Sequence, residues 1–207
     1  MSDQTRNPKE IVCAGYDQIS EEYRRDDFVF EGTGYQRFLT EFERYLKPGS
    51  RILDLGCGCG IPVARHLAQA HSVTGVDISQ VQIDRAKGLV PAANFLQADM
   101  TELSFPDSSF DAVVSFFAII HIPLAEQPAL FEKIARWLVP GGHFLATLGS
   151  NEWTGTRQDW HGGTMYWSHA NRHTYEEWLQ VAGFAILAER FLPEGDSGHA
   201  VFMAQKA

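Results

Sequence analysis

The sequence has few cysteines, few basic residues and no long apolar run. Its three cysteines, Cys13, Cys57 and Cys59, are too few for a disulfide framework, so we expect a reduced, cytoplasmic protein. Only 17 basic residues stand against 26 acidic ones, and the net charge is −9. Nucleic acids and anionic membranes are bound mainly through clustered positive charge, so we expect neither as a partner. No apolar stretch suits a signal peptide or a membrane span.

The chain has 207 residues, of which 44% are hydrophobic, so it can form one domain with a buried core and a small cap. Residues 1–34 are expected to form an N-terminal helical cap segment, because the pattern from Ile11 to Tyr23 is helical. Tyr16 and Tyr23 are seven residues apart and would share one face of that helix. Residues 35–207 are expected to form the main domain.

From residue 51 onward, short apolar runs alternate with amphipathic helical patterns. Strands are expected at 52–55, 72–76, 94–97, 111–116 and 143–148, and helices at 35–46, 62–69, 79–87 and 124–138. This alternation predicts an α/β fold with a parallel sheet and helices on both faces.

The last third of the chain departs from this alternation. Residues 149–173 are expected to form a long aromatic-rich connection, and a helix is expected over 174–182. Two final strands, 184–191 and 199–204, are joined by a short turn and should therefore pair antiparallel.

A glycine-rich turn follows the first strand of the alternating region. Asp54 precedes Gly56, Gly58 and Gly60, and such a turn lets a ligand approach the main chain and a helix N-terminus. A nicotinamide cofactor would need a third glycine where Ile61 stands. An acid just before the first glycine better suits a cofactor that has an ammonium group and no phosphate.

The segment from Asp54 to Gly60 resembles the first motif of the class I S-adenosylmethionine-dependent methyltransferases. Segments similar to the family's further motifs follow in order at Val76–Ser79, Gln97–Met100, Leu103–Val113 and Leu138–Gly142. The resemblance covers residues 35–205. It implies a Rossmann-like, doubly wound, seven-stranded sheet that is mostly parallel with an antiparallel C-terminal strand.

The resemblance also implies S-adenosylmethionine as the cofactor. The residues expected to bind it are Asp54, Gly56, Cys57, Gly58, Gly60, Asp77, Ile78, Asp99, Met100, Phe116 and Tyr23. Asp77 ends a strand about 20 residues past the turn, where a carboxylate can accept both ribose hydroxyls. Asp99 would accept from the adenine amine. The alternatives are a helix-capping acid for Asp77 and a solvated loop acid for Asp99. Cys57 and Cys59 would serve as small residues in the loop, because two thiols alone complete no metal site.

The candidate catalytic residues are His121, Tyr16, His169 and His199. His121 follows the fourth strand, at the sheet edge where ligands bind in open α/β sheets, and would be either a general base or a structural histidine. The resemblance implies that the N-terminal segment with Tyr16 closes over the cofactor; the alternative is that its tyrosines simply pack against the domain.

The aromatic connection at 149–173 is expected to cap an acceptor pocket. Its tryptophans Trp153, Trp160 and Trp167 would suit an apolar or aromatic acceptor, or an amine held by its charge. His169 and His173 have an i, i+4 spacing that could hold a metal on a helix, but no third ligand is evident, so no metal is expected.

We therefore expect a methyltransferase that transfers a methyl group to a small-molecule acceptor. Two alternatives stay open: a non-catalytic cofactor-binding or scaffolding protein with the same fold, and a nicotinamide-dependent reductase. The acceptor, the accepting atom and the oligomeric state cannot be read from the sequence.

Overall fold

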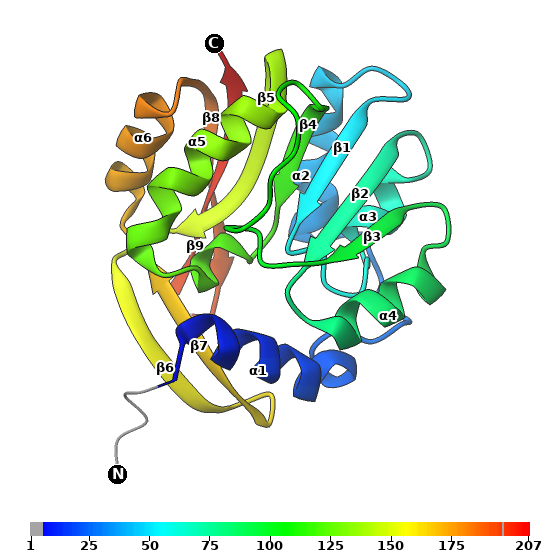
Figure 1. The fold of residues 1–207 in the computed structure, drawn as a ribbon, viewed down its shortest axis with the longest axis vertical. Coiled ribbons are helices and arrows are strands. Elements are labelled where there is room, and N and C mark those ends of the chain that lie inside the picture. Colours follow the sequence, from blue (N-terminus) through cyan, green and yellow to red (C-terminus); the bar gives the residue numbers. More distant parts are fainter. Residues whose placement is uncertain (1–5, 196) are drawn as a thin grey trace.

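The computed structural model describes residues 6–195 and 197–207 (Figure 1). The helices in these ranges are α1 (Pro8–Tyr23), α2 (Gly34–Phe42), α3 (Val63–Leu67), α4 (Gln80–Leu89), α5 (Gln127–Trp137) and α6 (Arg172–Val181). The strands are β1 (Arg51–Leu55), β2 (Ser72–Asp77), β3 (Asn94–Gln97), β4 (Phe110–Ser115), β5 (Leu138–Gly149), β6 (Trp153–Trp160), β7 (Gly163–His169), β8 (Phe184–Glu194) and β9 (Ser197–Lys206).

Seven strands form one sheet in the order β3-β2-β1-β4-β5-β9-β8. The pairs from β3 to β5 are parallel, whereas β9 runs antiparallel to both β5 and β8. The chain order reverses between β1 and β4, which is where ligands bind in doubly wound sheets. The predicted Rossmann-like sheet with one antiparallel strand near the C-terminus is confirmed.

The central strands are apolar on both faces because helices cover both sides of the sheet. In β1, Leu53 and Leu55 point into one core cluster, which includes Phe131 of α5. Ile52, which precedes Leu53 and so lies on the other face of the strand, points into the opposite cluster with Phe38 of α2. Figure 1 shows α5 and α6 in front of the sheet and α2 and α3 behind it.

The aromatic-rich connection expected at 149–173 contains a regular element that the sequence did not predict, an antiparallel hairpin of β6 and β7. It was missed because β6 is exposed or half-exposed along its whole length, so no alternation of buried and polar residues marks it. Its turn also lacks the Asn-Gly sequence that usually marks a hairpin. The positive φ values near the turn are instead taken by Asp159 and His161, at 58° and 50°.

Several element boundaries also differ from the prediction. The strand expected at 143–148 begins earlier, because β5 starts at Leu138. The two strands expected at 184–191 and 199–204 are longer, because β8 extends to Glu194 and β9 begins at Ser197. Single 3-10 turns at Glu43–Tyr45 and Leu124–Glu126 occupy parts of two predicted helices.

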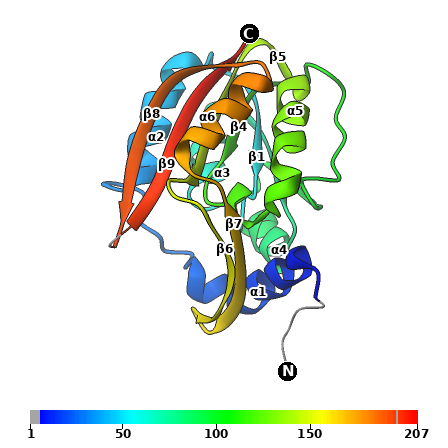
Figure 2. The same cartoon turned by 90° about the vertical axis from the view of Figure 1, so that its left-hand side faces the viewer.

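Helix α1 lies beside the hairpin, at the end of the sheet where the parallel strands finish (Figure 2). Asn7 caps it by accepting from the N–H of Lys9. Gly15 allows close packing on β7, since a Cβ atom there would lie 2.5 Å from the carbonyl oxygen of Thr164. None of the helices in residues 6–195 and 197–207 combines the length and apolar character of a membrane span.

Candidate functional site

Two neighbouring cavities lie beneath α1 and the hairpin, and we call them the inner and the outer cavity. Every predicted cofactor-binding residue except Gly60 lines the inner cavity. These residues come from the ends of β1, β2 and β4, the segment after β3, and α1. The parallel sheet brings together at one edge residues that are far apart in the chain. They lie at 54–58, 77–78, 99–100 and 116.

The glycine turn follows the inner cavity closely. Gly56 has a φ of 75°, and a Cβ atom there would lie 2.0 Å from Cβ of Ala118. Gly58 has a φ of 53° and donates its N–H to Asp77 Oδ2 at 2.9 Å. Gly60 lies outside the cavity lining; a Cβ atom there would lie 3.0 Å from Val90, so its small size serves packing under the turn.

Asp54 lines the inner cavity with a buried carboxyl group. Its side chain is buried, with a relative exposure of 1%, and Oδ2 has no hydrogen-bond partner. Burial, together with the charge of Asp77, raises the pKa of Asp54 to about 8. An unpaired buried carboxyl is costly, so this atom is suited to a cationic donor from a ligand.

Asp77 binds the backbone on both sides of the cavity. Its two oxygens accept from the N–H groups of Gly58 and Ser79, each at 2.9 Å. Burial raises the pKa of Asp77 to about 6, although these hydrogen bonds oppose the increase. Ser79 is itself the N-cap of α4, so Asp77 supports both the glycine turn and the helix start. Each oxygen retains a second lone-pair site that a ligand hydroxyl could use.

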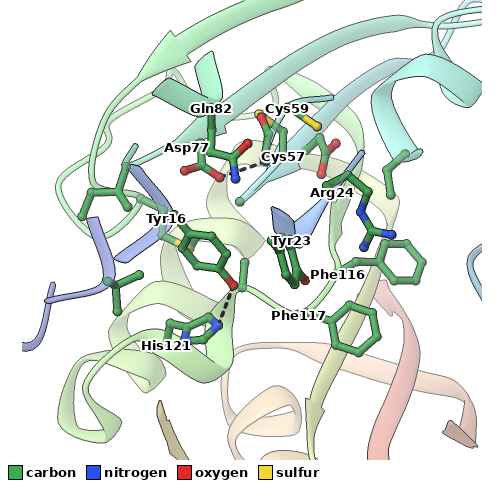
Figure 3. A pocket seen from close by; sticks show the side chains of 18 of the residues that line it. Tyr16, Tyr23, Arg24, Cys57, Cys59, Asp77, Gln82, Phe116, Phe117 and His121 are labelled. Atoms are coloured by element: carbon green, nitrogen blue, oxygen red, sulfur yellow. Dashed lines mark hydrogen bonds between the residues drawn. The ribbon is translucent and has the colours of Figure 1, made fainter. Parts of the chain in front are cut away.

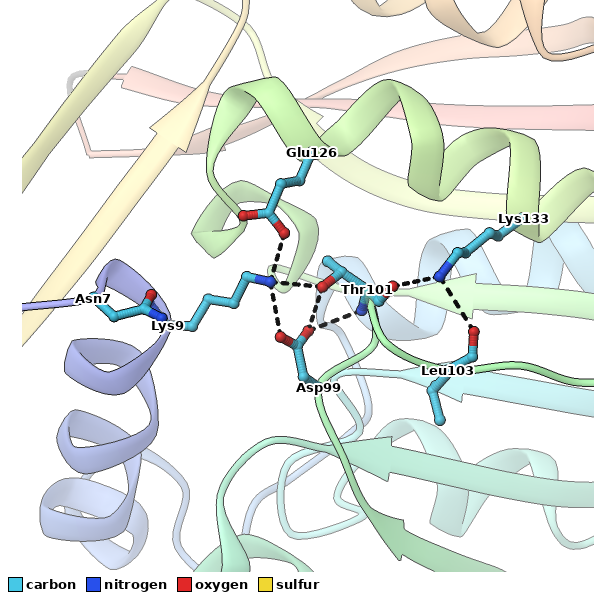
Figure 4. Close-up of polar contacts among 7 residues, drawn as sticks. All are labelled: Asn7, Lys9, Asp99, Thr101, Leu103, Glu126 and Lys133. Carbon is cyan, nitrogen blue, oxygen red and sulfur yellow. Dashed lines mark hydrogen bonds and ion pairs between the residues drawn. The ribbon is translucent and has the colours of Figure 1, made fainter.

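Asp99 is ion-paired to α1 (Figure 4). Lys9 Nζ lies 2.8 Å from Asp99 Oδ2 and 2.5 Å from Glu126 Oε2. Asp99 Oδ1 accepts from the N–H and hydroxyl of Thr101. Burial alone would raise the pKa of Asp99, but the bonds from Lys9 and Thr101 outweigh it and lower the pKa. The lysine therefore joins α1 to the segment after β3 across one end of the inner cavity.

The outer cavity is larger, with a volume of about 740 Å³. It lies between α1, the β6–β7 hairpin and the β8–β9 turn. Its aromatic lining is Tyr16, Tyr23, Tyr35, Phe117, Trp153, Trp160 and Trp167. Its charged or titratable lining is Arg24, His121, Glu152, Arg157, His161, His169, Glu194 and His199. Its size falls in the usual range for small-molecule sites.

The two cavities share one wall, which consists of Tyr16, Tyr23, Arg24, Tyr35, Phe117 and His121. At its centre, the Tyr16 hydroxyl lies 3.0 Å from His121 Nε2, and Figure 3 shows this hydrogen bond beside Tyr23 and Phe117. Phe117 has a φ of 56°, which is unusual for a bulky residue, and its N–H is held by the Thr147 hydroxyl. Ligands in the two cavities would therefore lie on either side of these six residues.

The hydrogen bonds of His121 define its protonation. Nδ1 lies 2.6 Å from the carbonyl oxygen of Tyr166, which can only accept, so Nδ1 carries the proton. Burial lowers the pKa of His121 to about 4, so the ring is neutral at pH 7. Nε2 is therefore an acceptor, and the Tyr16 hydroxyl donates to it. Burial also keeps the pKa of Tyr16 well above its usual range, so it remains a phenol.

Comparison with known proteins identifies the domain. Residues 52–142 match the family described as "Methyltransferase domain". A sterol 24-C-methyltransferase of Gibberella zeae is 39% identical over 137 residues, covering 59% of this chain and 34% of that protein. A phosphoethanolamine N-methyltransferase of Arabidopsis thaliana is 38% identical over 124 residues, covering 56% of this chain and 25% of that protein. The chain thus spans about a third or less of these two curated relatives.

The fold comparison covers the whole chain. The magnesium protoporphyrin IX methyltransferase of Synechocystis PCC 6803, solved with bound S-adenosylmethionine, has a TM-score of 0.73 over 100% of both chains, at 16% identity. Residues 52–142 thus match the methyltransferase family, and the whole chain has the fold of a solved methyltransferase that binds S-adenosylmethionine. The cofactor of this family is S-adenosylmethionine, and with this family match the nicotinamide-dependent alternative is not retained.

The polar groups that line the inner cavity are compatible with this cofactor, because the buried Asp54 carboxyl could pair with its ammonium group. Gly56 lets the turn pack tightly against Ala118, since a Cβ atom there would lie 2.0 Å from Cβ of Ala118. The inner cavity needs no phosphate-binding loop, because S-adenosylmethionine has no phosphate group.

Sequence reasoning missed two charged residues of the methyltransferase site, Lys9 and Arg24, which both line the inner cavity. Arg24 lies over the rings of Phe28 and Tyr35, with its carbon Cζ 4.2 and 5.3 Å from their centroids, and donates to the Tyr35 hydroxyl at 2.9 Å. Both lie outside the recognised motifs, in the helix and the polar segment before the first strand. No local pattern distinguishes them from surface charges.

His169 and His199 line the outer cavity but not the wall that it shares with the inner cavity. His169 Nδ1 donates to the Asn151 carbonyl at 2.5 Å, and His199 Nε2 pairs with Glu194 at 2.9 Å. The helical spacing expected for His169 and His173 is wrong, because His169 belongs to β7 and His173 to α6. Across residues 6–195 and 197–207, no three His, Cys, Asp or Glu side chains are grouped to hold a metal ion.

Proposed function

We propose that this protein transfers a methyl group from S-adenosylmethionine, bound in the inner cavity, to a small-molecule acceptor bound in the outer cavity. The observation that supports this most directly is the wall that the two cavities share. Methyl transfer is an in-line displacement, so the donor and the acceptor must approach each other from opposite sides. A shared wall of aromatic residues provides a meeting point that excludes water.

The charged groups of the inner cavity suggest how the cofactor is oriented. We assign Asp54 to its ammonium group and Asp77 to its ribose hydroxyls, with Asp99 and Met100 at the adenine. Arg24 would hold its carboxylate, because its guanidinium lies between aromatic rings and forms no ion pair within the described residues. When bound, S-adenosylmethionine supplies a methyl group on a positively charged sulfur.

The Tyr16–His121 pair is assigned to the acceptor side. The Tyr16 oxygen can accept a hydrogen bond from the acceptor while its own proton points to His121 Nε2. The pair can therefore orient the acceptor and, if needed, pass one proton from the acceptor through Tyr16 to His121. Because burial lowers the pKa of His121 to about 4, it is a weak base. The pair thus suits an acceptor that needs little help to lose its proton.

The family relatives support a small-molecule acceptor, since two of them are named for methylating a sterol and phosphoethanolamine. The division of the chain into a cap of residues 1–34 and a main domain of residues 35–207 remains a proposal. So do a cytoplasmic location and the absence of a nucleic-acid partner.

Turnover tests the proposal. The purified protein would be incubated with S-adenosylmethionine and a mixture of small molecules that includes phenols, thiols, amines and carboxylic acids, and formation of S-adenosylhomocysteine would be measured. We expect acceptor-dependent product, and none from a variant that cannot bind the cofactor. Cofactor binding without turnover for any acceptor class would favour the non-catalytic scaffold alternative.

A further inference from the structure

One face of the β6–β7 hairpin forms a wall of the outer cavity. Trp153 pairs with His169, Gly155 with Trp167 and Arg157 with Met165, so these side chains share one face of the hairpin. Met165 on this face packs toward α1, since a Cβ atom at Gly15 would lie 2.9 Å from its Cε. Trp153, Arg157, Trp167 and His169 all line the cavity.

Glycine at position 155 shapes this wall. A Cβ atom at Gly155 would lie 2.9 Å from the Trp153 ring, so the ring occupies the space that a side chain would take. Trp153 and Trp167 therefore lie side by side, with ring centroids 6.1 Å apart. Trp160 stands perpendicular to Trp167 at 5.2 Å. The wall thus offers both faces and edges of indole rings, against which an aromatic ligand can pack by stacking or edge-to-face contact.

Arg157 lies over these rings without an acidic partner. Its Cζ is 5.3 Å from the centroid of Trp153 and 5.9 Å from that of Trp167. In the ranges that the structure describes, its guanidinium forms no ion pair with a carboxylate, although the cavity also contains Glu152 and Glu194. Glu194 is instead paired with His199 at 2.9 Å. A guanidinium stacked on aromatic faces keeps its hydrogen-bonding edge available for an anion.

The position of Arg157 sets where such an anion would lie. Trp167 contacts Arg157 on one side and His121 on the other, with its ring centroid 5.3 Å from the His121 ring. The guanidinium is therefore separated by an indole from the Tyr16–His121 pair at the shared wall. A ligand that reaches both Arg157 and the Tyr16–His121 pair must therefore extend along the Trp167 indole, with a flat part between its two ends.

We propose that the methyl acceptor is a flat aromatic molecule with an anionic group, which Arg157 binds at the end of the acceptor remote from the methyl-accepting atom. This inference rests on the proposed methyl transfer. The neutral Tyr16–His121 pair agrees with it, since an acceptor whose reacting atom loses its proton readily needs no strong base. In a chain with a net charge of −9, Arg157 also offsets the repulsion that an anion would meet on approach.

Three probes that differ only in one end group test this proposal. Indole-3-acetate, indole-3-acetamide and tryptamine would be titrated calorimetrically into the protein saturated with S-adenosylhomocysteine. We expect the acid to bind about tenfold or more tightly than the amide, because a charge-assisted pair with Arg157 is available only to the acid. Arg157→Gln should weaken binding of the acid to the level of the amide and leave the amide unchanged.

Arg172→Gln is the matched control, because Arg172 is also exposed and pairs with Glu189 outside the cavity. Equal binding of acid and amide, tightest binding of tryptamine, unchanged acid binding in Arg157→Gln, or no binding of any probe at millimolar concentration would each overturn the proposal. Failure of S-adenosylhomocysteine itself to bind would instead contradict the proposed function. The two failures are therefore distinguishable.

Discussion

At the scale of single residues, Asp54 shows how a ligand site costs stability. Its carboxyl is buried without a partner for Oδ2, and burial raises its pKa to about 8. Asp54→Asn removes the ionisable group while keeping its shape. We expect the melting temperature of the ligand-free protein to rise by about 2–4 °C at pH 8, which corresponds to about 1 kcal/mol at this chain length.

The same substitution should weaken binding of S-adenosylmethionine by about tenfold or more, because the cofactor ammonium loses its charged partner. Asp111→Asn is the control, since Asp111 is ion-paired with Arg51 at 3.0 Å outside both cavities. That control should lower the melting temperature slightly and leave cofactor binding unchanged. A fall in stability for Asp54→Asn would mean that the buried carboxyl has a partner in solution.

The raised pKa values of Asp54 and Asp77 also predict a pH dependence. Both carboxyls hold their protons to higher pH in the folded than in the unfolded chain, with pKa values of about 8 and about 6. Their stabilising contribution is complete below about pH 4 and is lost as the pH rises through 6 and then 8. Unfolding followed from pH 5 to pH 9 should therefore show decreasing stability of the ligand-free protein.

Cofactor binding is expected to ionise Asp54. Calorimetric titration with S-adenosylmethionine at pH 7, in two buffers of different ionisation enthalpy, should show proton release on binding. Asp54→Asn should abolish the release. If the wild-type protein releases no protons, Asp54 is already ionised in the free state.

Tyr16 tests the acceptor side of the site. Tyr16→Phe keeps the aromatic packing with Tyr23, whose ring centroid is 5.4 Å away, but removes the hydroxyl that bonds to His121. We expect kcat to fall by about tenfold or more, with little change in the dissociation constant for S-adenosylmethionine. Unchanged kcat would show that the pair only supports the wall.

At the scale of secondary-structure elements, α1 covers the inner cavity and is held there by polar contacts. Besides the Lys9 contacts, Ser20 donates to Gln82 of α4 at 2.9 Å and Arg85 donates to Ser20 at 2.6 Å. Because α1 lines the inner cavity, we expect a bound cofactor to leave past this helix. The contacts that hold α1 in place should therefore govern how slowly the cofactor dissociates.

Lys9→Met removes the ion pairs to Asp99 and Glu126 while keeping most of the side-chain length. We expect the dissociation rate of S-adenosylhomocysteine, measured by stopped-flow fluorescence, to rise about tenfold, with a smaller effect on association. Lys87→Met on α4 is the control, because Lys87 is exposed and lies outside both cavities. Equal dissociation rates in both variants would show that Lys9 does not hold the helix over the cofactor.

The secondary-structure elements differ in how well the sequence predicted them. Strands such as β1 and β4 were predictable because burial on both faces demands continuous apolar runs between glycine-rich turns. The β6–β7 hairpin was not, because β6 has no buried face, whereas β7 packs on α1 through Met165. Its register is visible only once cross-strand pairs such as Trp153 and His169 are placed.

At the scale of the whole molecule, the sheet explains why part of the site could be predicted. Asp54 and Asp77 end neighbouring parallel strands, so their proximity follows from topology. The cavities are also lined by Lys9 of α1, Arg24 of the segment after α1, and Arg157 of β6. No rule of sequence spacing places these three residues relative to the sheet. Much of the lining of the inner cavity was therefore readable from motifs, whereas the lining of the outer cavity depends on how the additions fold over the sheet.

The most direct test of two cavities meeting at one wall is a crystal structure with S-adenosylhomocysteine. We expect the ligand in the inner cavity, with its amino group at Asp54, its ribose at Asp77 and its sulfur directed at the wall containing Tyr16 and His121. The open side of the sulfur would then face the outer cavity. A ligand bound elsewhere, or a sulfur directed away from Tyr16 and His121, would contradict methyl transfer between these cavities.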